Sequence, residues 1–430
     1  MKYLAAFVLV VGALLLTGCA QQARNAPSDG TLGVVAETGT VAPTATPVSS
    51  SPPVTGPVPR KGEWAAVAAA SYNTLALKRD GTLWAWGLND YGQLGQGNLD
   101  FTAHAEPRKI GQAHDWVAVS GGYGDSFALK KDGTLWAWGN NSDFGGNLGL
   151  GRLRITPPAP GFVTSRDFWA PTQVGHAHDW AAVFAGYEHG LATRTNGSLW
   201  GWGPNWYGAL GVGDTDWRWT PAEVGPGADW AAAAGGGDFS LALKKDGTLW
   251  AFGSNTYGNL GLGDTTDRHV PTQVGDAEDW ATVSAGTGYS LALKKNGTLW
   301  AWGHNDFGEL GLGDTIERHA PIQVGSANDW AAAYCLGHHS VALKRDGTLW
   351  AWGENDYGQL GVDDAADRSS PTQVGSAHDW ATIASGSADS YDTLALKQDG
   401  TLWAWGLNRF GQLGLGDTID RHLPTQVRTQ

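Results

Sequence analysis

The chain has 430 residues with 63 Gly, 24 Trp and only 16% charged residues. Many glycines and aromatic residues with few charges are typical of a turn-rich all-β protein, whereas a disordered chain would lack the aromatic side chains. The formal net charge is −14, and an acidic surface repels the phosphate backbone whose neutralisation supplies most nucleic-acid affinity. We therefore expect no binding to DNA or RNA.

The first 18 residues have the features of a secretory signal peptide. Lys2 precedes an apolar run from Tyr3 to Leu16, which is shorter than the roughly 20 residues of a membrane span. The segment Leu16-Thr17-Gly18-Cys19 resembles the bacterial lipobox. That resemblance implies cleavage before Cys19, lipidation of its thiol and acylation of its new amino end, which together give stable anchoring. The alternative is an ordinary secretory signal that contains a cysteine.

Residues 19–60 are expected to be the lipidated cysteine followed by a disordered tether. Positions 20–60 hold seven Pro, six Thr, six Ala, four Ser, four Gly and no aromatic residue, so they cannot bury enough surface to fold. Ala20 is not the Asp linked to inner-membrane retention. We expect an extracytoplasmic protein, anchored by lipid to the bacterial membrane, and to the outer membrane where there is one. Lipidation of Cys19 would leave Cys335 without an intramolecular disulfide partner.

Residues 61–430 consist of an internal repeat with three markers, each present seven times. The first is Asp/Asn-Gly-Thr/Ser-Leu-Trp, which begins at Asp80, Asp132, Asn196, Asp246, Asn296, Asp346 and Asp399. The second is a Trp after an acidic residue, at Trp64, Trp116, Trp180, Trp230, Trp280, Trp330 and Trp380. The third, mostly Pro-x-Gln-Val, begins at Pro107, Pro171, Pro221, Pro271, Pro321, Pro371 and Pro424. A period near 50 residues indicates a repeat architecture.

One unit contains four expected strands. Leu241 to Lys244 is a short strand, Asp246-Gly247 a favoured two-residue hairpin turn, and Thr248 to Phe252 the returning strand. Pro271 to Val274 and Trp280 to Val283 supply two more. Four strands in about 50 residues make a propeller blade, so we expect a monomeric, all-β, seven-bladed β-propeller.

The order of the markers suggests how the ring closes. The first unit begins at Trp64 without a preceding Pro-x-Gln-Val, and the missing piece arrives at Pro424 to Val427. We therefore expect the C-terminal strand to complete the first blade and so remove exposed sheet edges. Val58, six residues before Trp64, could compete for that edge.

The unit from Gly286 to Leu293, followed by Asn296-Gly-Thr-Leu-Trp-Ala-Trp-Gly303 and Asn305-Asp-Phe-Gly-Glu-Leu-Gly-Leu-Gly313, resembles the repeat of the RCC1 (regulator of chromosome condensation) family. The resemblance covers residues 61–428. It implies a propeller that binds other molecules, and for some members guanine nucleotide exchange on a small GTPase. A plant photoreceptor shares the fold, but its Gly-Trp-Arg-His-Thr signature is absent here.

Several motifs indicate a structural role and not a catalytic or ligand-binding one. The glycine-rich segment from Gly258 to Asp264 lacks the Lys of a phosphate-binding loop and recurs in most units. Asp264 and Asp267 offer too few oxygens for calcium. The histidines show no legible zinc site or triad, and His269 belongs to a repeat column. Cys335 is expected to be a buried small residue. We expect no catalytic residues, metal or cofactor, and therefore no enzyme.

Four tryptophans fall outside the repeat pattern, all in the second and third units. Polar residues occupy the equivalent positions of other units, and a local insertion of about 14 residues lies between Gly139 and Pro171. Exposed aromatic clusters mark binding sites, although the tryptophans could also pack under the insertion. The candidate binding residues are Arg152, Arg154, Phe168, Trp169, Trp206, Tyr207, Trp217 and Trp219.

The leading functional hypothesis is a cell-envelope lipoprotein that binds another envelope protein or a glycan. Inhibition of an extracellular enzyme is one specific form of it. Guanine nucleotide exchange is the alternative that the family resemblance implies, but GTPases and GTP are cytoplasmic, which argues against it in an exported protein.

Overall fold

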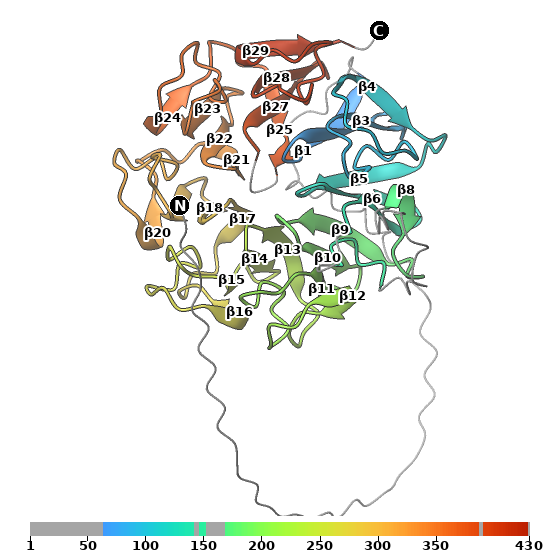
Figure 1. Cartoon of the computed structure of the whole chain (residues 1–430). Coiled ribbons are helices and arrows are strands. Elements are labelled where there is room, and N and C mark those ends of the chain that lie inside the picture. The colour runs from blue at the N-terminus through green and yellow to red at the C-terminus, as the bar shows by residue number, and fades with distance from the viewer. Residues whose placement is uncertain (1–62, 142–145, 152–167, 387–389, 429–430) are drawn as a thin grey trace, which may run out of the picture. The chain divides into compact units, whose positions relative to one another are not determined.

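The structure, a computed structural model, describes residues 63–141, 146–151, 168–386 and 390–428. These residues form seven sheets, each with four antiparallel strands, arranged as the blades of a propeller (Figure 1), which confirms the predicted all-β, seven-bladed propeller. Within the described ranges, no helix has the length and apolar character needed to cross a membrane.

The blades are numbered here in chain order, and each runs from its inner to its outer strand. Blade 1 contains β1 (Trp64–Ala69), β2 (Asn73–Lys78), β3 (Leu83–Gly87) and β4 (His104–Ile110); blade 2 contains β5 (Trp116–Gly121), β6 (Asp125–Lys130), β7 (Leu135–Gly139) and β8 (Phe168–Gln173). Blade 3 contains β9 (Trp180–Ala185), β10 (Gly190–Arg194), β11 (Leu199–Gly203) and β12 (Arg218–Glu223).

The remaining blades repeat this arrangement. Blade 4 contains β13 (Trp230–Gly235), β14 (Phe239–Lys244), β15 (Leu249–Gly253) and β16 (Arg268–Gln273); blade 5 contains β17 (Trp280–Ala285), β18 (Tyr289–Lys294), β19 (Leu299–Gly303) and β20 (Arg318–Gln323). Blade 6 contains β21 (Trp330–Leu336), β22 (His339–Lys344), β23 (Leu349–Gly353) and β24 (Arg368–Gln373). Blade 7 contains β25 (Trp380–Ile383), β27 (Asp392–Lys397), β28 (Leu402–Gly406) and β29 (Arg421–Val427), and the short β26 (Ser385–Gly386) joins the sheet of blade 1.

The predicted ring closure was wrong. The strand β29, which carries Pro424 to Val427, pairs with β28 in its own blade, and β4 supplies the outer strand of blade 1. The prediction failed because the Pro-x-Gln-Val segment belongs to the last strand of each unit, so the propeller begins with the first strand of blade 1 and ends with the last strand of blade 7. The ring closes instead through the parallel pairing of β1 with β26 and through a core in which Trp86 packs with Leu394 and Leu413.

The hairpin turn of the first marker also differs from the prediction. Gly247 has φ = +91°, but Asp246 is not among the residues with positive φ. The turn therefore has three residues rather than two: the amide of Gly247 donates to the carbonyl of Lys244, and Gly247 alone takes the left-handed conformation. Asp246 has a different role, because its Oδ1 accepts hydrogen bonds from the backbone N–H and the hydroxyl of Thr248.

The glycine-rich loops are structural, as predicted. In blade 4, Asn255 Oδ1 accepts the amide of Leu260 at 2.9 Å, and its Nδ2 donates to the backbone oxygen of Asp264. The Asp264 carboxylate is occupied by the Arg268 guanidinium at 2.7 Å and by the backbone N–H of Thr266. These bonds tie the two ends of the loop together and engage the Asp264 carboxylate.

Candidate binding site

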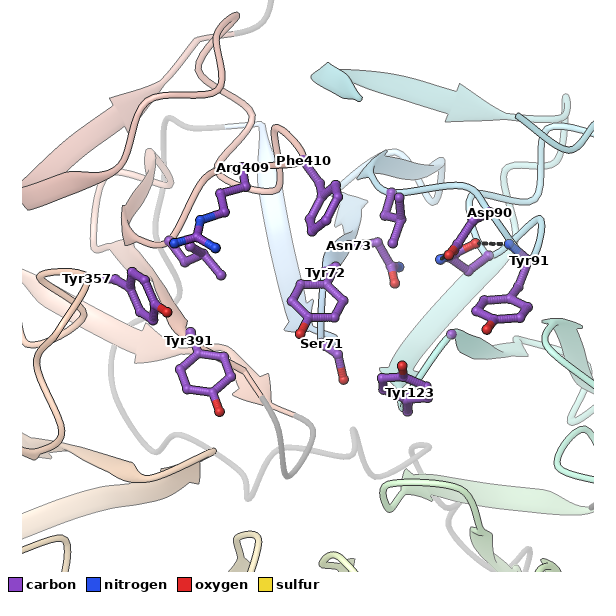
Figure 2. Close-up of a pocket in the computed structure, with 14 residues that line it drawn as sticks. Ser71, Tyr72, Asn73, Asp90, Tyr91, Tyr123, Tyr357, Tyr391, Arg409 and Phe410 are labelled. Atoms are coloured by element: carbon purple, nitrogen blue, oxygen red, sulfur yellow. Dashed lines mark hydrogen bonds between the residues drawn. The ribbon is translucent and has the colours of Figure 1, made fainter. Parts of the chain in front are cut away.

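Each blade places two loops at the same end of its sheet, one between its first and second strands and one between its third and fourth, because successive strands run antiparallel. At this end, blades 6, 7, 1 and 2 line a cavity of about 450 Å³, which we call the tyrosine cleft (Figure 2). Its main lining side chains are those of Ser71, Tyr72, Asn73, Asp90, Tyr91, Gln93, Tyr123, Tyr357, Tyr391, Arg409 and Phe410.

The tyrosine cleft spans the junction where the ring closes. Tyr72 lies in the β1–β2 loop and Tyr123 in the β5–β6 loop, whereas Tyr391 directly precedes β27 and Phe410 lies in the β28–β29 loop. Residues from the two ends of the propeller sequence therefore meet in one cavity. It follows that the cleft requires a closed ring.

Aromatic rings contact one another across blade boundaries. Phe410 of blade 7 meets Tyr72 of blade 1 with ring centroids 5.2 Å apart and an interplanar angle of 66°. Tyr357 of blade 6 meets Tyr391 of blade 7 at 5.7 Å and 81°. Edge-to-face pairs of this kind add about 0.5–1.5 kcal/mol each beyond area burial. The walls of the cleft are therefore fixed by packing between blades.

The two sides of the cleft carry opposite charges. The Arg409 guanidinium lies over the Tyr357 ring, 5.2 Å from its centroid. Asp90 accepts a hydrogen bond of 2.9 Å from the Gln93 amide. Figure 2 shows Arg409 and Tyr357 on one side and Asp90 and Tyr91 on the other, with Tyr72 between them. Such a site can stack against flat or apolar groups and hydrogen-bond to polar ones at both ends.

Two buried carboxyl groups directly follow residues that line the cleft. Asp392 follows Tyr391 and Asp125 follows Gly124, and both aspartates are 0% exposed. Among the described residues, no other side chain forms a hydrogen bond with either carboxyl group. Burial raises the pKa of Asp392 well above its usual range. Burial, with a smaller contribution from the nearby Glu188 carboxylate, does the same for Asp125. Both groups are therefore neutral acids over a wider pH range than exposed aspartates.

The structure brings two of the sequence-predicted tryptophans together. Trp206 and Trp217 form an edge-to-face pair with centroids 4.6 Å apart, and Trp206 is 56% exposed. Trp206 and Tyr207, which is also exposed, lie in the β11–β12 loop, the blade 3 equivalent of the loop that carries Arg409 and Phe410. This aromatic pair therefore belongs to the loop type that builds the tyrosine cleft.

The other two tryptophans occupy a packing position that repeats in every blade. A Cβ added to Gly92 would lie 2.5 Å from Trp169, and one added to Gly146 would lie 2.8 Å from Trp219. His269 packs on Gly208 in the same way, which confirms the predicted repeat role of this column. Trp169 and Trp219 are half-buried and hold the following blade against the turn of the preceding one.

Of the remaining predicted binding residues, the structure describes only Phe168. Phe168 is half-buried and packs against the core between blades 2 and 3. Arg152 and Arg154 lie outside the described residues. Cys335 is buried, as predicted, and burial raises the pKa of its thiol to about 12.

The sequence analysis did not identify the tyrosine cleft. Five of the 11 tyrosines line it, and three of them, Tyr72, Tyr123 and Tyr391, stand in the loops between first and second strands. Those loops vary between units, so they carry no repeat marker. If Tyr72, Tyr123 and Tyr391 are mapped onto a closed ring of seven units, they fall in three adjacent units around the junction where the ring closes.

The fold and loop arrangement define a repeat propeller whose blades are contiguous in sequence. The model of the regulator of chromosome condensation (RCC1) repeat matches residues 80–129, 196–243, 246–293, 296–343, 346–389 and 399–430, together more than half of the chain. The chain belongs to the RCC1-repeat family, as the sequence predicted.

The chain is similar in part of its sequence, or in its fold, to several other proteins. A segment of 153 residues is 31% identical to the ultraviolet-B receptor UVR8 of Arabidopsis thaliana, covering 35% of this chain and 31% of UVR8. The structure of human WBSCR16 aligns with a TM-score of 0.68 at 21% identity, over 81% of this chain and 94% of WBSCR16. Prp20p of Saccharomyces cerevisiae aligns with a TM-score of 0.64 at 22% identity, over 75% and 80% of the two chains. Identities at this level between the structures establish the fold alone.

Proposed function

We propose that this protein is a cell-envelope lipoprotein whose propeller binds another envelope protein, with the tyrosine cleft as the contact site. The observation that carries the proposal is the composition of the cleft: five tyrosines, one phenylalanine, one arginine, and short polar side chains in a cavity of about 450 Å³. Tyr, Ser, Asn and Arg are the residues that rigid recognition surfaces use most, because they combine large contact area with hydrogen bonding at low entropic cost.

Rigidity supports a binding role. The cleft is built on loops that the same hydrogen bonds between backbone amides and side-chain oxygens fix in several blades. For example, the amide of Leu413 donates to Asn408 Oδ1, and that of Phe410 donates to Gln412 Oε1. A preorganised site loses little conformational entropy when a partner binds. Prp20p, a protein of the same fold, is described with binding properties to Gsp1p and histones. Binding of proteins by an RCC1-type propeller is thus the functional class we assign.

A glycan is the second candidate ligand, because of one specific feature. Aromatic rings lie between a carboxylate, Asp90, and a guanidinium, Arg409 (Figure 2), so that a sugar ring could stack while its hydroxyl groups bond at both ends. An aromatic wall with a few placed polar groups is the usual form of a small-ligand site.

The anchor is part of the proposal. Residues 1–18 would direct export, Cys19 would carry the lipid, and the segment up to residue 60 would act as the tether. A Cys19→Ala variant should leave the membrane fraction and should fail to incorporate labelled palmitate. Retention of both properties by the variant would reject the lipoprotein assignment.

Loss of binding on truncation of the cleft tests the binding site. The double variant Tyr72→Ala/Tyr391→Ala should reduce capture of the envelope partner at least tenfold after cross-linking in intact cells. Tyr257→Ala is the matched control, because Tyr257 occupies the blade 4 position equivalent to Tyr357, is 40% exposed and does not line the cleft. Equal capture by the double variant and the control would exclude the cleft. A glycan array with the same three proteins distinguishes sugar from protein ligands.

A further inference from the structure

Three side chains with metal-binding chemistry meet between blades 5 and 6, outside the tyrosine cleft. His304 directly follows β19, Glu309 lies in the β19–β20 loop, and His338 lies in the β21–β22 loop. One ligand atom from each residue lies within 4.8 Å of the other two. Two imidazoles and one carboxylate are a donor set that Zn²⁺ accepts, with a fourth position left for water.

The orientation of His304 suits a metal ligand. Its Nδ1 lies 2.5 Å from Glu309 Oε1, and its Nε2 lies 3.2 Å from Asp306 Oδ2. The ion-pair contact with Asp306 favours a proton on Nε2, while Nδ1 faces Glu309. A carboxylate on the far nitrogen of a ligating histidine is the usual outer shell of a zinc site, because it fixes the tautomer and raises the basicity of the ligand.

His338 supplies a second, independent indication. Its Nδ1 is buried and has no hydrogen-bond partner among the described residues. Leaving a buried polar atom without a partner is unfavourable, and a bound cation would satisfy this nitrogen.

The equivalent residues of the sister blades show what Glu309 adds at its position. The sister blades place Gln93, Gln359 and Gln412 where blade 5 has Glu309. Each of these side chains accepts the backbone N–H two residues earlier, at 2.9–3.0 Å, and Glu309 does the same through Oε2. An amide is therefore sufficient for the fold. Glu309 adds a second buried carboxyl oxygen, Oε1, that faces His304.

The surroundings shield most of the cluster from bulk solvent. Glu309 is fully buried and the His304 side chain is 12% exposed. Tyr257 covers His304, with ring centroids 4.8 Å apart, and Phe307 lies against His338 at 5.1 Å. Apolar walls strengthen electrostatic attraction between a cation and its ligands.

We propose that His304, Glu309 and His338 bind one Zn²⁺ ion, with water as the fourth ligand and Asp306 as the outer-shell partner of His304. In the metal-free protein the hydrogen bond between His304 and Glu309 holds two of the ligands together. Entry of the ion releases the proton between His304 Nδ1 and Glu309 Oε1 to solvent, and small side-chain rotations bring the three donors to the 2.0–2.2 Å that zinc requires. The ion links blade 5 to blade 6.

Metal binding by the full-length chain tests this proposal. Calorimetry with Zn²⁺ and metal analysis after dialysis should show one bound ion per wild-type chain, and none of comparable affinity for Mg²⁺ or Ca²⁺. Glu309→Gln should weaken zinc binding about 10–100-fold while it keeps the fold, because glutamine stands at this position in three sister blades. His338→Ala should lose the site.

His269→Ala is the matched control, because His269 lies on the outer strand β16. This variant should bind zinc like the wild type. Zinc should raise the melting temperature of the wild type and the control but not that of Glu309→Gln. Equal zinc uptake by the wild type, Glu309→Gln and His338→Ala would overturn the proposal.

Discussion

The indole Nε1 of Trp86 donates a hydrogen bond of 2.8 Å to the backbone carbonyl of Gln412, 326 residues further along the chain. The same bond joins neighbouring blades elsewhere in the ring, for example from Trp352 to the carbonyl of Glu309 at 2.8 Å. The junction between the last and first blades is therefore built like an internal one. This equivalence explains how the ring closes without exchange of a strand.

Replacement of Trp86 by Phe should cost about 1–2 kcal/mol in the free energy of unfolding. The variant loses one hydrogen bond, but the carbonyl of Gln412 still accepts the Thr74 hydroxyl at 2.8 Å. Blade 4 already has Phe252 at this position. Denaturant unfolding should give the same cost for Trp352→Phe at the internal junction. A much larger loss for Trp86→Phe would show that the closing junction is the weak one.

Asp392→Asn should stabilise the protein at neutral pH by roughly 1–3 kcal/mol. The folded pKa of Asp392 lies well above its usual range, whereas the unfolded chain ionises near pH 3.9. The contribution of the protonated group is complete below about pH 4 and is lost as pH rises toward the folded pKa. The variant should therefore match the wild type at pH 4 and exceed it at pH 7. Asn73, at the same register position of blade 1, shows that an amide fits.

His339→Phe should reduce the sensitivity of the protein to acid. Burial, with a smaller contribution from His338, lowers the pKa of His339 to about 3. The unfolded chain takes up this proton near pH 6.5, so stability falls as pH drops from there toward 3. Phe239 occupies the same register position in blade 4. Between pH 7 and pH 4, the melting temperature of the variant should fall less steeply than that of the wild type. An equally steep fall in both proteins would mean that other groups cause the acid sensitivity.

Trp206→Ala should change the free energy of unfolding by less than about 1 kcal/mol, because the side chain is mostly exposed. Trp352→Ala, which empties a fully buried position, should cost about 3–5 kcal/mol. If the Trp206–Trp217 pair extends the contact surface, Trp206→Ala should weaken partner capture while the melting temperature stays within a few degrees. A large drop in melting temperature would indicate a packing role instead.

The repeat markers predicted the blades because the polar residues of the first marker make the same hydrogen bonds in every blade. Trp300 donates to the hydroxyl of Thr298, which in turn donates to Asn296, and this chain of bonds requires the residue types of the first marker. The path of ring closure was not predictable from the order of markers alone. Closure with and without exchange of the C-terminal strand places the same strands in seven blades. Only the pairing of β28 with β29 distinguishes the two arrangements.

The binding site was predicted only in part. Trp206 and Trp217 stood out because they replace polar residues, and the structure places them in contact. The tyrosine cleft joins Tyr72 to Phe410, which are too far apart in sequence for any local pattern to relate them. The His304, Glu309 and His338 cluster was missed for the same reason, since its members come from two blades.

Photo-crosslinking from the tyrosine cleft is the most direct test of the central claim, that this propeller binds an envelope partner at the junction of its first and last blades. A photo-crosslinking amino acid would be placed at position 391 in one variant and at position 257 in another, both in the full-length chain in intact cells. We predict a discrete adduct of one partner from position 391 and none from position 257. Adducts of equal yield from both positions, or from neither, would contradict the claim.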